Sequence, residues 1–350
     1  MYPSRSCFLP SWSEAQRSRG CHSRTSGHDW TDYYHPRVAG IDVGVVTFNT
    51  RDVTVAALER LRASAGDVPL RVLVHDNAST DGSADAIRAA IPAAEVEVGE
   101  HNVGFAAGMN RLIARSSARW FLALNSDAWP EPGAIERLVA AGEQHPSAAA
   151  IAPLLLRPDG SLEHSTFPFP SLPVAAMTAF GGYRWLWPRA SRRRALVGAW
   201  QHDVPRDVDW AVGAALLMRR SALDAVGPFD ESFFMYAEDL EWCWRARRGG
   251  WSIWFEPAAV VRHIGNASGA TMYGHARTKA HIHNSYRFYR RVHGRAATLG
   301  YRALNIAGCG RLYVMARLRG DKPGRVEWAD QLRAHGSRLS PADGPPSQRR

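Results

Sequence analysis

Short runs of apolar, often β-branched residues alternate with windows of helical periodicity from residue 43 onward. The runs predict strands and the windows predict helices. The first predicted strands are 43–48, 72–75, 96–98 and 120–124, and the predicted helices are 54–63, 83–90, 104–116 and 132–145. Later apolar runs at 210–219, 251–255 and 258–263 are also predicted as strands. Alternation of this kind implies a mostly parallel sheet that is covered by helices on both faces. We therefore expect an α/β fold with a Rossmann-like sheet, whose ligands bind beyond the carboxyl ends of the strands.

The size and charge of the chain limit what it can be. It has 350 residues, 45% of them hydrophobic, and a formal net charge of +10. Such a chain buries a substantial core, which excludes a disordered protein. The charge calls for an anionic partner, which could be nucleic acid, an acidic membrane surface or a phosphorylated small molecule. No recognised nucleic-acid motif is present, so we expect no nucleic acid and keep a nucleic-acid-binding protein as a rival hypothesis.

The four cysteines, Cys7, Cys21, Cys243 and Cys309, include no C-x-x-C pair. Neither a zinc site nor a disulfide framework is indicated, and a reducing cytosol fits best. No run of about 18 apolar residues is present that could cross a bilayer. We therefore expect a cytoplasmic protein.

Composition also predicts how the chain is divided. The first 38 residues are rich in Ser, Arg, His and Gly and have no sustained hydrophobic period, so we expect a disordered tail. A central domain is predicted at 39–295, with a first half at 41–155, an insert at 167–208 and a second half at 209–295; a basic amphipathic helical extension follows at 296–336 and a disordered tail at 337–350. The insert is rich in Pro, Trp and Arg, which suits either an anionic, apolar partner or a solvated basic flap.

Polar residues follow the first two predicted strands. They are Thr47 and Asn49 after the first strand, and Asp76, Asn77, Ser79 and Asp81 after the second. The second loop combines a carboxylate, hydroxyls, amides and a glycine turn, which together suit the edge of a nucleobase and a ribose. It equally resembles an ordinary Asx-rich turn with a helix cap at Ser83, and both interpretations stay open.

The loop after the third strand is rich in small residues and contains Gly104, Phe105 and Asn110. Its glycines and alanines permit a close approach of the backbone. It lacks the Lys-Ser/Thr ending of a Walker A loop, so it is not a specific phosphate signature.

The fourth strand ends in Asn125-Ser-Asp127, so the amide and the carboxylate leave the strand on the same face. Oxygen ligands of this kind suit one hard cation, such as Mg²⁺ or Mn²⁺, bound to a diphosphate. The alternative is a cap between the strand and a turn. His263, which follows a later predicted strand, could be a metal ligand or simply a packed residue.

Glu238 and Asp239 stand side by side after an aromatic run, at the start of a predicted short helix that ends in arginines and Gly249. Their like charges raise one pKa of the pair, whereas the helix dipole acts in the opposite direction. Either Asp239 is a general base, or it is an N-cap and Glu238 is a solvated neighbour.

Six motifs occur in a fixed order along the chain. They are V-V-T-F-N at 45–49, D-N-A-S-T-D-G-S at 76–83, N-V-G-F-A-A-G-M-N at 102–110, N-S-D at 125–127, G-P-F-D-E-S-F-F-M-Y-A-E-D at 227–239 and V-R-H at 261–263. Together they resemble the inverting glycosyltransferases of family 2, which have the GT-A fold, and within them the bacterial rhamnosyltransferase-like branch. The resemblance covers residues 43–289. Each motif alone is weak, whereas their order is specific.

The resemblance implies a role for each candidate residue. Nucleotide-sugar binding would fall to Thr47, Asn49, Asp76, Asn77, Ser79, Asp81, Gly104, Phe105, Asn110 and Asn125. Asp127 and His263 would bind the divalent cation, Mg²⁺ or Mn²⁺, while Asp239 would be the general base and Glu238 would shape its site. Asn125 departs from the usual D-x-D pattern, which puts its own role in doubt because an amide oxygen brings no charge.

The resemblance also implies substrates. We expect dTDP-L-rhamnose as the donor and a lipid-linked acceptor at the cytoplasmic face of the inner membrane, where the basic segments would contact anionic lipid. The alternatives are a UDP- or GDP-sugar donor, an inert sugar-nucleotide-binding scaffold, or a nucleotidyltransferase on a related fold. The oligomeric state stays open. The glycosyltransferase hypothesis requires that Asp76, Asp127, Asp239 and His263 meet in the folded chain.

Overall fold

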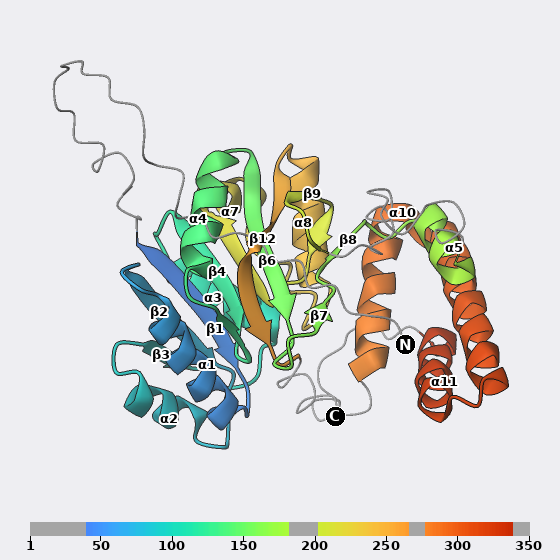
Figure 1. Ribbon diagram of the computed structural model, residues 1–350, viewed down its shortest axis with the longest axis horizontal. Coiled ribbons are helices and arrows are strands. Elements are labelled where there is room, and N and C mark those ends of the chain that lie inside the picture. The colour runs from blue at the N-terminus through green and yellow to red at the C-terminus, as the bar shows by residue number, and fades with distance from the viewer. Residues whose placement is uncertain (1–39, 182–201, 266–276, 339–350) are drawn as a thin grey trace, which may run out of the picture. The chain divides into compact units, whose positions relative to one another are not determined.

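A mostly parallel β-sheet forms the centre of the computed structural model (Figure 1). Strand β1 (Ile41–Thr47) lies between β2 (Leu70–Asp76) and β4 (Trp120–Asn125) and is parallel to both, and β3 (Glu95–Val98) adds to β2 in the same direction. The structure describes residues 40–181, 202–265 and 277–338. Outside these residues lie the first predicted tail, most of the second, and positions 182–201 of the predicted insert, which include Arg184, Arg189, Arg192, Arg193 and Arg194.

The second half of the sheet contains antiparallel strands. Strand β11 (Ala215–Arg219) runs antiparallel between β4 and β6 (Ala148–Leu156), and β12 (Ser252–His263) is parallel to β6. Three short strands extend this half: β5 (Ala128–Pro130) and β9 (Arg206–Val208) pair with β12, and β7 (Leu162–Glu163) pairs with β6. The prediction of an α/β fold with a mostly parallel sheet is confirmed.

Helices cover both faces of this sheet, as the alternation of side chains along β1 requires. Val43 and Val45 face one core with α1 (Arg51–Ser64), α2 (Ser83–Ala90) and α4 (Ala134–Gln144). Val46 faces the other core with α3 (Phe105–Arg115), α7 (Arg220–Val226) and α8 (Glu238–Arg248). The two cores fix the sheet between two helical layers.

One predicted strand is interrupted in the structure. Residues 210–219, which read as a single apolar strand, form β10 (Trp210–Ala211) and β11, with Gly213 between them. Strand β10 leaves the main sheet and pairs with β8 (Thr166–Phe167). Conversely, the segments predicted as two strands at 251–255 and 258–263 form the continuous strand β12, with a bulge in its pairing with β6. Pairing partners therefore decide where these strands begin and end.

The C-terminal part is helical. Helix α10 (Arg277–Leu318) bends at Gly294, whose φ of 80° and ψ of 177° are not helical. It packs against α5 (Leu172–Phe180) and α11 (Lys322–Gly336), which lie beside it in Figure 1. Before the bend, Phe288 packs against Phe233 and Leu240 of the central domain. The bend lies next to the predicted boundary at residue 296, and the division into domain and extension stays a prediction. In the described part of the chain, no helix combines the length and the apolar character that a bilayer span requires.

Candidate active site

Three strands end at the same edge of the sheet. The register pairs Thr47 of β1 with Asp76 of β2, and Val46 with Asn125 of β4. Beyond β4, the Asn125 N–H donates to the carbonyl of Ala214, 2.9 Å away, just before β11. The loops that the sequence singled out therefore follow one another along this edge.

The first two loops are joined by hydrogen bonds. Asn49, with a left-handed φ of 50°, donates its N–H to Ser79 Oγ at 2.9 Å and accepts the Thr80 N–H on Oδ1 at 2.7 Å. The carboxylate of Asp76, 1% exposed, accepts the Ser79 N–H at 2.6 Å. These bonds between side chains and backbone set the shape of both loops.

Two of the predicted nucleotide-binding side chains have local partners. The Thr47 hydroxyl lies 3.0 Å from those of Thr50 and Thr54, in a buried cluster. Asp81 accepts N–H groups from Arg51 and Ser83; burial alone would raise its pKa, but these hydrogen bonds hold the pKa below its usual value. The roles of Thr47 and Asp81 in nucleotide binding stay predictions.

The third loop connects the first half of the sheet to the second. Asn77 donates from Nδ2 to the Gly104 carbonyl at 3.1 Å, and the Phe105 N–H donates to the Phe234 carbonyl at 2.8 Å. Gly104 has a φ of 89°, and a Cβ on it would lie 2.3 Å from the Phe234 carbonyl oxygen. Glycine is needed here because no side chain fits between the two segments. Asn110 lies further into α3 and bonds to Phe229 instead of facing the loops.

Asp127 and His263 meet at the end of this edge. Asp127 Oδ1 lies 3.2 Å from His263 Nε2, and Asn125 Nδ2 lies 3.3 Å from the same nitrogen. The other ring nitrogen, Nδ1, lies 3.0 Å from Glu163 Oε2 on β7. Burial lowers the pKa of His263, but the hydrogen bonds and charges of Asp127 and Glu163 outweigh it and raise the pKa to about 9. The two carboxylates therefore favour a proton on the imidazole of His263.

This arrangement fits a divalent cation in place of that proton. Two ligands of an octahedral Mg²⁺ lie about 3 Å apart, which matches the spacing of Asp127 Oδ1 and His263 Nε2. Glu163 on Nδ1 would then fix the ring as carboxylates do around metal-binding histidines. Within the described residues, no group of three or more His, Cys, Asp or Glu side chains could hold an ion by itself. A cation here would take its remaining ligands from substrate phosphates and water.

Asp239 stands at the first turn of α8. Its Oδ2 accepts the Gly213 N–H at 2.9 Å, and its Oδ1 accepts the Leu240 N–H at 2.7 Å. The N-cap of α8 is Ala237, so the alternative in which Asp239 is the cap is wrong. Tyr236 and Ala237 both have φ near 70°, an unusual conformation for residues other than glycine. These two strained residues immediately precede Glu238 and Asp239 in the chain.

Glu238 and Asp239 differ in their surroundings. Glu238 is 6% exposed, and its Oε2 has no hydrogen-bond partner among the described residues. Burial and the neighbouring charge of Asp239 raise the pKa of Glu238 well above its usual value. Burial also raises the pKa of Asp239, whereas N–H groups of Gly213 and Leu240 act against this rise. Of the two, Asp239 is therefore the carboxyl group that ionises more readily.

The elements that carry the four residues of the spatial hypothesis lie along one edge of the sheet, and Asp127 and His263 are in direct contact. Asp239 bonds to Gly213, Gly213 adjoins Ala214, and Ala214 bonds to Asn125, two residues before Asp127. Asp76 lies on the same edge, two strands away. The sequence analysis missed Glu163 and Gly213. No pattern in the sequence marked Gly213 as functional. Glu163 follows Pro158-Asp-Gly-Ser161, a turn sequence typical of a hairpin, which does not predict a contact with His263, 100 residues later.

The fold and the site define a GT-A type glycosyltransferase, and comparisons with known proteins agree. Residues 42–195 match the profile described as Glycosyl transferase family 2. The chain is 34% identical over 249 residues to the N-acetylglucosaminyl-diphospho-decaprenol L-rhamnosyltransferase of Mycobacterium tuberculosis, covering 66% of this chain and 79% of that protein. The chain belongs to glycosyl transferase family 2, and its resemblance to the rhamnosyltransferase branch is confirmed.

Two further proteins are similar to it. The rhamnosyltransferase WbbL of Escherichia coli is 30% identical over 84 residues, which are 24% of this chain and 31% of that protein. A solved mannosyltransferase of Pyrobaculum calidifontis, in complex with GDP-Man and Mn²⁺, has a TM-score of 0.53 at 17% identity, covering 84% of this chain and 85% of that one. The second likeness shows a shared fold.

The His263 cluster predicts a pH dependence of stability in cation-free protein. Its folded pKa of about 9 exceeds the ordinary value of 6.5, so the stabilisation is complete below the unfolded pKa and is lost as the pH rises through the folded one. In EDTA, we expect His263→Gln to lower the free energy of unfolding, and the difference from wild type to shrink by roughly 3 kcal/mol on going from acidic to alkaline pH. Urea denaturation at several pH values measures it. A constant difference across the range would contradict the assignment.

Proposed function

We propose that this glycosyltransferase moves L-rhamnose from dTDP-L-rhamnose to a hydroxyl of a prenyl-diphosphate-linked sugar, with inversion at the anomeric carbon. One observation carries the proposal. The Asp239 carboxylate at the start of α8 and the Asp127–His263 pair lie at the same sheet edge, connected by the hydrogen bond from the Gly213 N–H to Asp239 and by the backbone hydrogen bond from Asn125 to Ala214. The candidate base for the acceptor and the candidate cation site for the donor are thus connected by hydrogen bonds at one edge of the sheet.

The chemistry follows from this arrangement. Asp239 accepts the proton of the acceptor hydroxyl while the hydroxyl oxygen forms a bond to the anomeric carbon of the donor sugar. The bond between that carbon and the diphosphate oxygen breaks on the opposite face, so the diphosphate is the leaving group. With its raised pKa, Glu238 would keep its proton, and a single negative charge would then lie next to the acceptor. Asp127 and His263 would hold the cation, Glu163 would orient His263, and the loops with Asn49 and Asp76 would face the nucleotide. When bound, a divalent cation neutralises the departing diphosphate.

The substrates are proposed from the relatives. The relatives from M. tuberculosis and E. coli are both named as rhamnosyltransferases, and the name of the first also contains a decaprenyl-diphosphate-linked N-acetylglucosamine. The divalent cation in general is supported by the Mn²⁺ in the mannosyltransferase structure and by the fit of the Asp127–His263 pair. The choice between Mg²⁺ and Mn²⁺ is left to experiment.

The C-terminal helices support a place on the membrane surface. Residues 277–338 carry fourteen Lys and Arg but three Asp and Glu. Large apolar side chains are exposed among them and on α5: Leu318 (81%), Leu299 (68%), Val326 (64%), Phe180 (58%) and Val314 (52%). Basic and apolar side chains on one helical unit are typical of binding to anionic lipid. We propose that α5, α10 and α11 hold the enzyme at the cytoplasmic face of the inner membrane, where a prenyl-linked acceptor resides.

A panel of nucleotide-sugars tests the donor. Each of dTDP-rhamnose, UDP-N-acetylglucosamine and GDP-mannose is offered with Mn²⁺, with Mg²⁺ or with EDTA, and thermal shift and released nucleotide are measured. We expect the largest stabilisation from dTDP-rhamnose with a cation, about 2.7 kcal/mol at a hundredfold excess over Kd. A larger thermal shift with a UDP- or GDP-sugar would show that dTDP-rhamnose is not the preferred donor. A shift that is the same in EDTA would show that donor binding needs no divalent cation.

Asp239→Asn tests the base. The amide keeps the size of the side chain but takes up no proton, so kcat for transfer should fall by about two to four orders of magnitude. The Kd for dTDP, measured by calorimetry, should stay close to wild type because Asp239 lies on the acceptor side. Asp85→Asn, on the exposed surface of α2, is the matched control. Unchanged turnover in Asp239→Asn would remove Asp239 from this role.

Sedimentation with vesicles tests the membrane surface. At low salt, the enzyme should bind phosphatidylglycerol vesicles and not phosphatidylcholine vesicles, and the double substitution Leu299→Glu, Leu318→Glu should reduce binding by about tenfold or more. Val98→Glu, at an exposed apolar residue of β3, introduces the same kind of charge elsewhere and should bind as wild type. If wild type and both variants bound the vesicles equally, or if wild type did not bind, the proposal that these helices contact the membrane would be wrong.

A further inference from the structure

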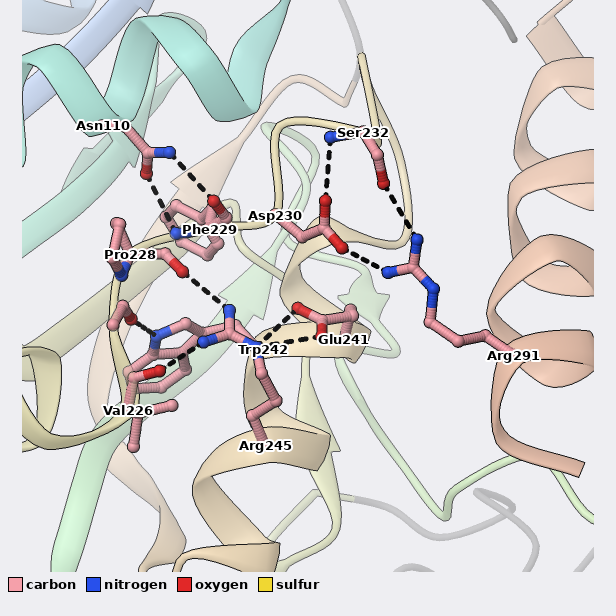
Figure 2. A network of polar contacts seen from close by, with 11 residues as sticks. Asn110, Val226, Pro228, Phe229, Asp230, Ser232, Glu241, Trp242, Arg245 and Arg291 are labelled. Carbon is pink, nitrogen blue, oxygen red and sulfur yellow. Dashed lines mark hydrogen bonds and ion pairs between the residues drawn. The ribbon is translucent and has the colours of Figure 1, made fainter. Parts of the chain in front are cut away.

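The segment that leads to the base is held by side chains from three helices (Figure 2). It comprises residues 227–237, between α7 and α8, and ends in the left-handed pair Tyr236 and Ala237. Because Asp239 follows two residues later, the direction of its carboxylate depends on where this segment lies. Its anchors are therefore candidates for residues that act on the reaction without touching a substrate.

The first anchor is Asn110 of α3. Its Nδ2 donates to the Phe229 carbonyl and to Glu231 Oε1, both at 2.9 Å, and its Oδ1 accepts the Phe229 N–H at 2.9 Å. Asn110 is 9% exposed and lies 119 residues before Phe229 in the sequence. Both amide donors are thus engaged with this segment, whereas the sequence analysis had assigned Asn110 to the nucleotide-sugar.

Helix α8 provides the second anchor, since two of its side chains donate hydrogen bonds to the start of the segment. Trp242 donates from Nε1 to the Gly227 carbonyl at 2.9 Å. Arg245 donates to the Pro228 carbonyl at 2.7 Å and is itself held by both oxygens of Glu241. A shift of the segment therefore shifts the first turn of α8, which carries Asp239.

The third anchor comes from α10, on the other side of the segment (Figure 2). Arg291 forms an ion pair with Asp230 and donates to Ser232 Oγ at 3.2 Å. Arg287 donates to the Ser232 carbonyl at 2.7 Å, one turn earlier on the helix. The segment is thus fixed between α3, which follows the donor loops, and α10.

We infer that Asn110 and Arg291 are positioning residues that hold Asp239 in line with Gly213, and that Asn110 does not bind the nucleotide. The inference rests on the proposed role of Asp239 as the base. Its structural part is separate, because the Asp239–Gly213 hydrogen bond exists without any substrate.

Asn110→Asp tests the inference, since a carboxylate at this position faces the Phe229 carbonyl and Glu231 with no donor. Two readouts are used. Hydrogen exchange of the Gly213 amide reports whether Asp239 still accepts it, and kinetics with dTDP-rhamnose and a short-chain prenyl-diphosphate-linked N-acetylglucosamine report the reaction. We expect exchange to accelerate about tenfold and kcat to fall about tenfold to a hundredfold, because small displacements of a catalytic group have large effects. The Kd for dTDP should stay within about twofold of wild type.

A second substitution should restore part of the loss. When Glu231→Gln is added to Asn110→Asp, the new amide can donate to the carboxylate introduced on α3, so kcat and Gly213 protection should both recover by about threefold or more. Gln144→Glu, on the exposed end of α4, is the matched change of amide to carboxylate and should behave as wild type. If Asn110→Asp does not fold, Arg291→Met remains informative because Arg291 is 47% exposed. It should lower kcat and Gly213 protection and leave the KM of the acceptor unchanged.

Opposite results would overturn the inference. A Kd for dTDP that rises in step with the loss of activity would make Asn110 a nucleotide contact, and wild-type exchange at Gly213 in both variants would show that neither holds Asp239. A raised acceptor KM with unchanged kcat in Arg291→Met would make Arg291 an acceptor contact. If wild type does not turn over the chosen donor, the proposed substrate is wrong, and the exchange measurements still decide the inference.

Discussion

The hydrogen bond from the Gly213 N–H to the Asp239 carboxylate is the contact on which the site depends. Gly213 interrupts the strand formed by 210–219, so its N–H is free of the sheet and points to α8. A Cβ on Gly213 would lie 3.3 Å from the Cβ of Asp239, so the residue must be small. Through Ala214 and Asn125 the same contact continues to the cation-binding end of β4. The helix with the base is thereby tied to the strand with the metal ligand.

Two buried groups of charges stand at this edge, and each is balanced differently. Asp127 and Glu163 lie on the two ring nitrogens of His263 and raise its pKa, whereas burial and the charge of Asp239 raise the pKa of Glu238. Burying unpaired charges is costly, so a site that needs both a base and a metal-binding carboxylate must compensate each one. A divalent cation held by Asp127 and a neutral His263 would likewise compensate the buried Asp127 carboxylate.

The two sides of the site are built in different ways. On the donor side, hydrogen bonds among Asn49, Asp76 and Ser79 join the loops that follow β1 and β2, two strands that pair side by side in the sheet. On the acceptor side, the segment before Asp239 takes its position from Asn110 and Arg291, which belong to distant helices. The position of the base therefore depends on the packing of α3 and α10 against this segment, whereas the donor loops are held by contacts with each other.

The sequence by itself determined the α/β alternation, the strand end at Asp76, the turn at Asp127 and the helix that begins at Glu238, because periodicity and turn chemistry act over a few residues. The order of its motifs identified the family. It did not determine that His263 meets Asn125 from 138 residues away, that Glu163 holds its ring, or that Asn110 bonds to Phe229. Those contacts depend on β11 entering the sheet antiparallel between β4 and β6, and only the packing of the complete sheet decides that order.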